Sequence, residues 1–370
     1  MPISRLLPAS FEQPNPKNLI INGNMGCSQR GSVSKTTNSW GYTLDRWELS
    51  NYIDDTITVT QDSDAPSGTG LGNSMKITGS SGDNSLDASD YLSMVTKLEG
   101  QDLQVFNKGT SSAVPMTFSF WIKTTTTGTY ILEFADNDNT RKISKSYTVS
   151  ASNQWEYKSI TIDADTTGTL DDDNNNSLWI QLWFAAGANF TGGGSLNSSW
   201  TSGTSVNTRV KGQVNGMSSG SHNIYITGVC LNVGSKSISG NDGKSFPHES
   251  FAETLNKCSR YYHRITWDND NNRAFPSYCQ NSTSAIATHT FPVPMRTRPT
   301  AIETNGTATD YDVARINTIT VCSAVPSYNE ANIFRTSMVY TTAGSLTAGE
   351  GGQCRLRNDS GSYLAWSAEL

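Results

Sequence analysis

Apolar and polar residues alternate in short runs along most of the chain, and clusters of Asn, Asp, Gly and Ser separate the runs. A period of two predicts β-strands, and the clusters predict the turns between them. In the clearest run, 116–123, Phe118, Phe120 and Ile122 fall on one face of the expected strand and Trp121 falls on the other. About eleven such strands are expected before residue 240, which predicts an antiparallel two-sheet sandwich. The expected strands are 18–25, 41–49, 56–61, 74–78, 91–98, 116–123, 128–135, 141–149, 156–163, 177–185 and 222–233.

The run 177–185 differs from the others because both of its faces are apolar or aromatic. Trp179, Gln181 and Trp183 alternate with Ile180, Leu182 and Phe184. A strand of a solvated sheet normally has one polar face. We therefore expect a loop, a neighbouring chain or a ligand to cover one face of this strand. The long Gly-rich stretch 187–217, which carries Trp200, is expected to be a surface loop or a loosely ended pair of strands.

The segment 246–264 is the one convincing helix. Ser250 can serve as its N-cap, and Glu253 follows three residues later, which predicts a capping box. The apolar residues recur at helical spacing and predict one buried stripe. The stripe comprises Phe251, Leu255, Cys258 and Tyr262. A helix this short needs a surface to pack on, so we interpret it as a connector that docks on β-structure.

The pattern divides the chain into an N-terminal arm at 1–17, a large β-domain at 18–240, the connector helix at 246–264 and a small β-sandwich at 265–370. Four prolines interrupt the arm, and about six further strands are readable after the helix. The fold class predicted is therefore all-β, with a length that allows two separate cores.

The charge balance excludes some partners. Charged residues make up 16% of the chain, the net charge is −6, and no cluster of Lys and Arg suits nucleic-acid phosphates. No run approaches the roughly 18 apolar residues of a membrane-spanning helix. The N-terminal segment lacks the apolar core of a signal peptide, so folding in a reducing cytoplasm is expected.

The six cysteines are widely spaced and form neither a C-x-x-C pair nor a zinc pattern. We expect them to be small buried hydrophobes, with a disulfide formed after release as the alternative. The run Asp268–Asn272 offers oxygen ligands for calcium, but it lacks the glycine and the distal glutamate of an EF-hand loop. The sequence therefore predicts no cofactor, with plain turns in place of a calcium site.

A search for catalytic patterns argues against an enzyme. The chain has no nucleophile elbow, zinc-protease helix, P-loop or Rossmann glycine pattern, and its four histidines are scattered. Asp163, Asp165 and the run 171–173 would suit glycoside hydrolysis if two carboxylates were held roughly 5–10 Å apart. Solvated turn residues account for these acids more simply, so we expect no enzymatic activity.

Aromatic side chains are the better candidates for chemistry. Their rings stack on the apolar faces of sugars, while neighbouring Asn, Asp and Gln bind the hydroxyls. The alternative is core packing, which we expect for Trp40 and Trp47. The glycan-binding candidates are Trp121, Trp179, Trp183, Trp200 and Trp267.

Ten segments follow one another along the chain: NLIINGNM (18–25), Gln29-Arg30-Gly31, Tyr42-x-x-Asp45-Arg46-Trp47, SFWIK with GTY (119–130), Trp155, Asp165-x-x-Gly168, GVCLNVG (228–234), Cys-x-Arg-Tyr-Tyr (258–262), FPVPMRTRP (291–299) and the final SAEL. In this order they resemble the family of bacteriophage tail-fibre and tail-associated proteins, whose N-terminal part is similar to a carbohydrate-binding-module jelly roll. The resemblance covers residues 18 to 370. Two departures stand out: Leu231-Asn232 replaces the family's Leu-Glu, and Met25-Gly26 follows Asn24 where related modules place an acidic calcium ligand.

The resemblance implies a jelly-roll N-terminal domain in a structural virion protein of a tailed bacteriophage, assembled in the host cytoplasm. A tail fibre or similar appendage that contacts host surface glycans is the expected role, with other tail or capsid proteins as partners. Several weak sugar sites presented together would add avidity, so a homotrimer is expected. Two alternatives stay open: a capsid-decorating or head-fibre protein without a receptor role, and a glycan hydrolase or its accessory binding module.

Overall fold

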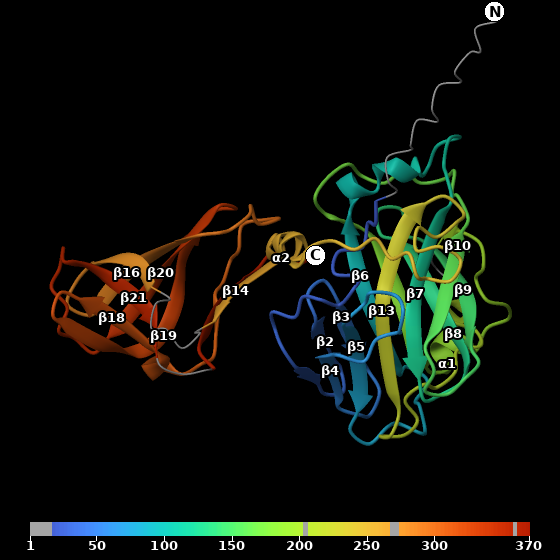
Figure 1. Cartoon of the computed structure of the whole chain (residues 1–370), viewed down its shortest axis with the longest axis horizontal. Helices are drawn as coiled ribbons and strands as arrows, with labels where there is room; N and C mark the ends of the chain where they lie inside the picture. The colour runs from blue at the N-terminus through green and yellow to red at the C-terminus, as the bar shows by residue number, and fades with distance from the viewer. Residues whose placement is uncertain (1–16, 203–205, 267–273, 358–360) are drawn as a thin grey trace, which may run out of the picture. The chain divides into compact units, whose positions relative to one another are not determined.

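The computed structural model describes residues 17–202, 206–266, 274–357 and 361–370 (Figure 1). Of the predicted arm, only residue 17 is described, and both Trp267 and the calcium candidate Asp268–Asn272 lie outside the described residues. The chain forms two compact units. The second unit comprises Cys27–Gly31, Leu44–Arg46 and Ser250–Leu370, and the first unit holds the rest of the chain.

The first unit is a sandwich of two antiparallel sheets, as the strand pattern predicted, but two of the expected strands are wrong: 18–25 contains a turn and no strand, and a turn divides 41–49. Rings from the two sheets meet in its core, where Phe118 contacts Phe134 at 6.0 Å and Phe120 contacts Tyr147 at 5.2 Å between centroids. The six-stranded sheet has the order β1 (Val33–Lys35), β4 (Ile57–Asp62), β5 (Ser74–Gly79), β13 (Asn223–Val233), β7 (Met116–Thr124), β10 (Glu156–Ile162). The seven-stranded sheet has the order β12 (Thr201–Ser202), β9 (Arg141–Val149), β8 (Gly128–Asp136), β11 (Asn176–Ala186), β6 (Tyr91–Glu99), β3 (Glu48–Asn51), β2 (Ser39–Tyr42).

Strand β7 confirms the predicted alternation. Phe118, Phe120 and Ile122 are fully buried in the core. On the opposite face, the hydroxyl of Thr117 donates to the carbonyl of Gly234 at 2.7 Å. The segment that follows β13 therefore covers the outer face of the six-stranded sheet at this strand.

Short helical turns occupy several loops of the described chain. They satisfy backbone groups where strands end. These are η1 (Gly100–Asp102), η2 (Gln104–Phe106), α1 (Ala188–Thr191), η3 (Val206–Thr208) and η4 (Ala308–Asp310). No helix in the described part of the chain is long and apolar enough to cross a membrane.

The predicted helix is α2 (Phe251–Ser259), and its start is as expected. The hydroxyl of Ser250 accepts the amide N–H of Glu253 at 3.2 Å, and the Glu253 carboxylate accepts the amide N–H of Ser250 at 2.9 Å. The predicted extension to residue 264 is wrong, because the chain enters β14 (Tyr262–Thr266) and pairs with β22 (Tyr363–Ser367).

The predicted apolar stripe of α2 is also only partly right. Phe251 is 63% exposed, whereas Cys258 is buried together with Thr254 and Ser259. The buried side is therefore the C-terminal half of the helix, next to the turn into β14. Helical spacing alone could not show that the first turn lacks cover.

Replacing Ser250 by alanine should destabilise the second unit by about 1 kcal/mol, because the Glu253 amide loses its acceptor and the capping box opens. Urea unfolding monitored by circular dichroism measures this change. Ser282→Ala, at an exposed serine of the same unit, is the matched control and should change stability by less than about 0.5 kcal/mol. Equal effects of the two substitutions would contradict the capping assignment.

The second unit is also all-β, but its strands close into a barrel instead of two open sheets. The barrel closes because β21 pairs with β15 on one side and with β18 on the other. A three-stranded sheet of β14, β22 and β17 (Glu303–Thr304) completes the unit, and Leu364 and Trp366 of β22 belong to the barrel core. The barrel order is β15 (Ala274–Cys279), β16 (Ser284–Thr290), β20 (Arg335–Thr342), β19 (Thr318–Ala331), β18 (Tyr311–Arg315), β21 (Gly351–Leu356).

Candidate functional site

Trp183 lies on the outer face of β11, where the segment after this strand folds back over it. The ring is 1% exposed and packs with Ile131 and Val210, and Phe190 lies 5.5 Å away between centroids. The guanidinium of Arg209 sits 5.1 Å from the Trp183 ring. A loop therefore supplies cover for this end of the two-sided strand, and Trp183 has no free ring face for a ligand.

Trp121 and Trp200 are half-buried and have structural partners. The indole N–H of Trp121 donates to the carbonyl of Gly243 at 3.3 Å, and its ring packs on Tyr157 at 5.5 Å. The indole N–H of Trp200 donates to the carbonyl of Asp163 at 2.8 Å. These bonds fix both rings against the chain.

Trp179, four residues before Trp183 on β11, is half-buried on the same outer face. The ammonium of Lys97 lies 4.9 Å from the centroid of the Trp179 ring and 5.8 Å from that of Tyr42. Lys97 also forms an ion pair with Glu48 at 2.9 Å. An ion pair flanked by two aromatic rings therefore occupies this part of the seven-stranded sheet. We call Tyr42, Glu48, Lys97, Trp179 and Gln181 the outer-face platform.

Strand register explains why these side chains share a face. Tyr42 is paired with Glu48, Glu48 with Val95, and Val95 with Gln181. Directly opposed residues of antiparallel strands point to the same side of a sheet. Lys97 is opposed to Trp179 in the same way. The platform thus runs across four neighbouring strands, β2, β3, β6 and β11.

Trp40 adds an exposed ring at the edge of this face. It lies two residues before Tyr42 on the edge strand β2, so both side chains point to the same side. The Trp40 side chain is 62% exposed, and the expectation that it belongs to the core is wrong. The parallel expectation for Trp47 is confirmed, because Trp47 is fully buried.

The polar groups of this face are ordered by hydrogen bonds and ion pairs. The Gln181 side-chain amide donates to the Ser93 hydroxyl at 2.7 Å. Glu133 of β8, which is directly opposed to Gln181, accepts two bonds from the Arg209 guanidinium, at 2.8 and 2.5 Å. Burial, with the nearby Arg209 charge, lowers the pKa of Lys142. Rings, an amide and paired charges therefore line a preorganised surface that suits a polyhydroxyl ligand better than an ion.

Two of the turn acids are paired with basic side chains. Asp163 contacts Lys145 at 2.8 Å, and its side chain is largely exposed. Asp165 is buried, which corrects the expectation of a solvated turn residue, and it binds Arg141 and Lys108. Burial alone would raise the pKa of Asp165, but the hydrogen bonds from Arg141 and Lys108 outweigh it and hold the pKa below the ordinary value. These contacts assign Asp165 a structural role.

The six cysteines are buried and free, as expected. Within the described residues, Cys27, Asp45 and Cys258 place their donor atoms within 4.8 Å of one another. The Asp45 carboxylate already accepts two bonds from Gln29, at 2.6 and 2.7 Å. A hydrogen bond with Cys27, together with burial, raises the pKa of Cys258 well above the ordinary value and disfavours the thiolate. Closed zinc sites use four ligands, so this trio fits a buried polar contact better than a metal site.

Sequence patterns missed most of the platform. Trp179 was predicted, whereas Tyr42, Glu48, Lys97 and Gln181 were not singled out as ligand-binding residues. Alternation within β6 and β11 does place Lys97 and Trp179 on outer faces, but only the strand order brings them together. That order is a long-range property which a local pattern does not contain.

The fold and this surface define the first unit as a β-sandwich with an aromatic and polar outer face. No protein-family model and no curated protein matches the chain. Among solved structures, the chain is similar to the enzymatically active domain of bacteriophage CBA120 tailspike protein 4, with 11% identity over 58% of this chain and 21% of that one, at a TM-score of 0.31. The chain thus spans about a fifth of that tailspike domain.

Two further similar structures are carbohydrate-binding modules. The family 11 module from Clostridium thermocellum, in complex with a mixed-linked tetrasaccharide, has 15% identity over 55% of this chain and 96% of that one, at a TM-score of 0.29. TmCBM61, in complex with β-1,4-galactotriose, has 10% identity over 59% of this chain and 99% of that one, at a TM-score of 0.28. These identities and TM-scores are low, so the likeness to these structures assigns no ligand to this chain.

Proposed function

We propose that the first unit is a glycan-binding module and that its ligand lies on the outer-face platform. The observation that carries this proposal is the position of Lys97, paired with Glu48 and flanked by the rings of Trp179 and Tyr42. The half-buried Trp179 ring offers an apolar face, and the charged and amide groups beside it offer hydrogen bonds. A sugar ring requires this combination, because its faces carry C–H groups and its edge carries hydroxyls.

The ion pair also favours a neutral sugar over a charged one. Glu48 and Lys97 neutralise each other, so neither charge is left to attract an ionic ligand. A carboxylate accepts several bonds and an ammonium donates three, so an ion pair of this kind can also bind hydroxyls where its edge is reached; Glu48 and Lys97 are 5% and 7% exposed. The rings then hold the ligand by stacking, and the polar groups select its orientation.

We further propose that the chain is a structural, non-enzymatic virion protein of a tailed bacteriophage, a tail fibre or similar appendage. The resemblance of its ordered segments to that family supports this role, as does a glycan-binding surface. A homotrimer would present three platforms together and raise avidity. Sedimentation of a stable monomer at micromolar concentration would contradict the trimer. Copy number per virion separates a fibre, present in few copies, from a capsid-decorating protein, present in hundreds.

Replacing Trp179 by alanine should weaken glycan binding by roughly 10–100-fold, because the stacking face is lost while the β11 backbone remains. The experiment screens the full-length protein on a glycan array, then measures the affinity for the best glycan by titration calorimetry.

Trp121→Ala is the matched control, because Trp121 is also a half-buried tryptophan on the outer face of a central strand, but in the other sheet. It should leave affinity within about 2-fold of the wild type. Retained binding in Trp179→Ala, or a larger loss in Trp121→Ala, would contradict the location of the site.

A further inference from the structure

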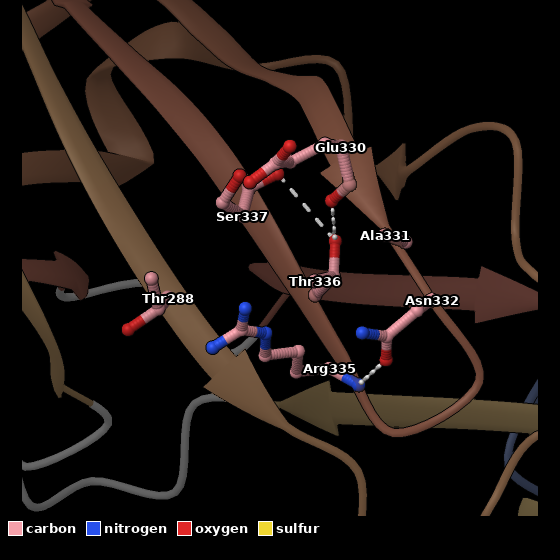
Figure 2. A pocket seen from close by; sticks show the side chains of 7 residues that line it. All are labelled: Thr288, Glu330, Ala331, Asn332, Arg335, Thr336 and Ser337. Atoms are coloured by element: carbon pink, nitrogen blue, oxygen red, sulfur yellow. Dashed lines mark hydrogen bonds between the residues drawn. The ribbon is translucent and has the colours of Figure 1, made fainter.

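The barrel of the second unit carries a separate polar hollow of about 210 Å³. It lies between β16 and the hairpin that joins β19 to β20 (Figure 2). We call it the barrel hollow. Its lining residues are Thr288, Glu330, Ala331, Asn332, Arg335, Thr336 and Ser337.

The backbone around the barrel hollow is held in place by the hairpin's own side chains. The Asn332 side-chain carbonyl accepts the amide N–H groups of Phe334 and Arg335, at 2.8 and 3.0 Å. The Thr336 hydroxyl donates to the carbonyl of Glu330 at 3.1 Å (Figure 2). Because Thr336 is buried, these bonds fix the floor and the rim before any ligand arrives. Preorganisation of this kind lowers the entropic cost of binding.

Two opposite charges face the barrel hollow without meeting. Arg335 and Glu330 are exposed, and neither side chain forms an ion pair or a side-chain hydrogen bond with any residue that the structure describes. Figure 2 shows the Arg335 guanidinium extended toward Thr288, whereas the Glu330 carboxylate lies beside Ser337. The hollow therefore presents a planar donor on one side and an acceptor on the other.

We propose that the barrel hollow binds a single neutral sugar ring. Its volume of about 210 Å³ suits one pyranose and not a longer chain. Neighbouring hydroxyls of a sugar can accept hydrogen bonds from the guanidinium of Arg335 and donate to the carboxylate of Glu330 at the same time. An anionic ligand would satisfy Arg335 but place its charge near Glu330, so a neutral polyol is preferred.

This site differs from the outer-face platform in its chemistry, since polar groups and not aromatic rings provide its contacts. It lies in the other unit, so its existence does not depend on the function proposed for the platform. Two weak sugar sites on one chain add avidity wherever both reach the same glycan-coated surface.

Saturation-transfer NMR on the full-length protein tests the proposal, with methyl α-D-glucopyranoside and methyl β-D-galactopyranoside as probes at millimolar concentration. The Trp179→Ala variant serves as the reference, because it weakens the platform and leaves the barrel unaltered. We expect one or both glycosides to give transfer signals with this variant. Adding Arg335→Ala or Glu330→Gln should weaken the remaining binding by roughly 10-fold or more. N-acetylneuraminic acid, as the anionic comparison, should bind more weakly than the glycosides.

Three results would overturn the proposal: no signal from either glycoside with the wild type, a signal that disappears with Trp179→Ala alone, or a signal that Arg335→Ala and Glu330→Gln leave unchanged. Both barrel substitutions are at exposed positions, and circular dichroism confirms that each variant is folded. Failure of the platform proposal has a different signature, because the wild type and Trp179→Ala would then bind the array glycan equally.

Discussion

Replacing Lys108 by methionine should destabilise the first unit by about 3–5 kcal/mol, which lowers its melting temperature by on the order of 10 °C. The Lys108 side chain is 2% exposed, and its ammonium contacts Asp136 and lies 3.1 Å from Asp165. It also donates to the carbonyls of Thr167 and Gly168, at 3.1 and 2.9 Å. Methionine keeps the apolar stem and removes the charge. Asp165 retains Arg141, but the buried Asp136 loses Lys108, its ion-pair partner among the described residues.

Calorimetric melting of the full-length protein measures this effect. Lys76→Met is the matched control, because Lys76 and Asp62 form a partly exposed pair at 3.6 Å that is worth at most about 1 kcal/mol. Adding Asp136→Asn to Lys108→Met should restore part of the lost stability, since the uncompensated charge is removed. If Lys108→Met costs no more than Lys76→Met, the buried cluster does not stabilise the fold as argued.

Acidification from pH 7.5 to pH 5 should destabilise the second unit by about 2–4 kcal/mol through two histidines. The Nε2 atoms of His263 and His289 lie 3.0 Å apart, and both imidazoles stack on Trp366 and contact Phe291. Burial lowers the pKa of His289 from 6.5 to about 4. Burial, with the neighbouring His289, lowers the pKa of His263 to about 3.

The sign follows from proton binding. Because both pKa values are depressed in the folded state, the unfolded chain binds protons as soon as the pH falls below 6.5, while the folded chain does not. Stability is therefore complete above pH 6.5 and is lost as the pH falls toward 4 and 3. The carboxylates whose folded-state pKa is lowered, such as Asp55 and Asp165, lose their contribution only in more acidic solution.

Urea unfolding of the full-length protein at pH 7.5 and pH 5 measures the loss of stability in the second unit. The variant His263→Phe/His289→Phe keeps the aromatic stack and removes both titrating groups. Its free energy of unfolding should therefore be nearly the same at pH 7.5 and pH 5. An equal pH dependence in the wild type and the double variant would contradict the assignment to these histidines.

Local patterns predicted the elements whose environment follows from their own residues. The alternation of Phe118, Phe120 and Ile122 specifies a strand face in β7 because a period of two permits no other arrangement with one buried side. Ser250 and Glu253 likewise determine the start of α2 through bonds within four residues. The end of α2 depends on the pairing of Tyr262 with a strand a hundred residues later, and no local pattern contains that partner.

The candidate site shows the same division. The pattern of β11 indicates that one of its faces needs cover. It does not show whether Trp179 or Trp183 is covered, because both side chains lie on the same face of the strand. The segment carrying Phe190 and Val210 folds over Trp183, whereas Trp179 is half-buried, and this long-range contact decides which of the two rings is fully enclosed. The apolar residues within that Gly-rich stretch were the one signal that it folds back on the sheet.

The sequence pattern also did not predict that the strands of the second unit close into a barrel. Strand β21 is only six residues long, yet its pairing with both β15 and β18 turns a sheet into a barrel. The barrel hollow lies on the neighbouring strands β16, β20 and β19, where Thr288 of β16 is opposite Ser337 of β20. Arg335 and Glu330 are ordinary exposed residues in the sequence, and only the folded hairpin brings them to one hollow.

Hydroxyl-radical footprinting of the full-length protein, with and without the best glycan from the array, tests the central claim most directly. Mass spectrometry then reports the oxidation of each aromatic residue. The account predicts that bound glycan protects Trp179, Tyr42 and Trp40 severalfold, while Trp121 and Trp200 are oxidised equally in both samples. Protection of Trp121 or Trp200, with Trp179 and Tyr42 unchanged under saturating glycan, would contradict the claim that the outer-face platform is the binding site.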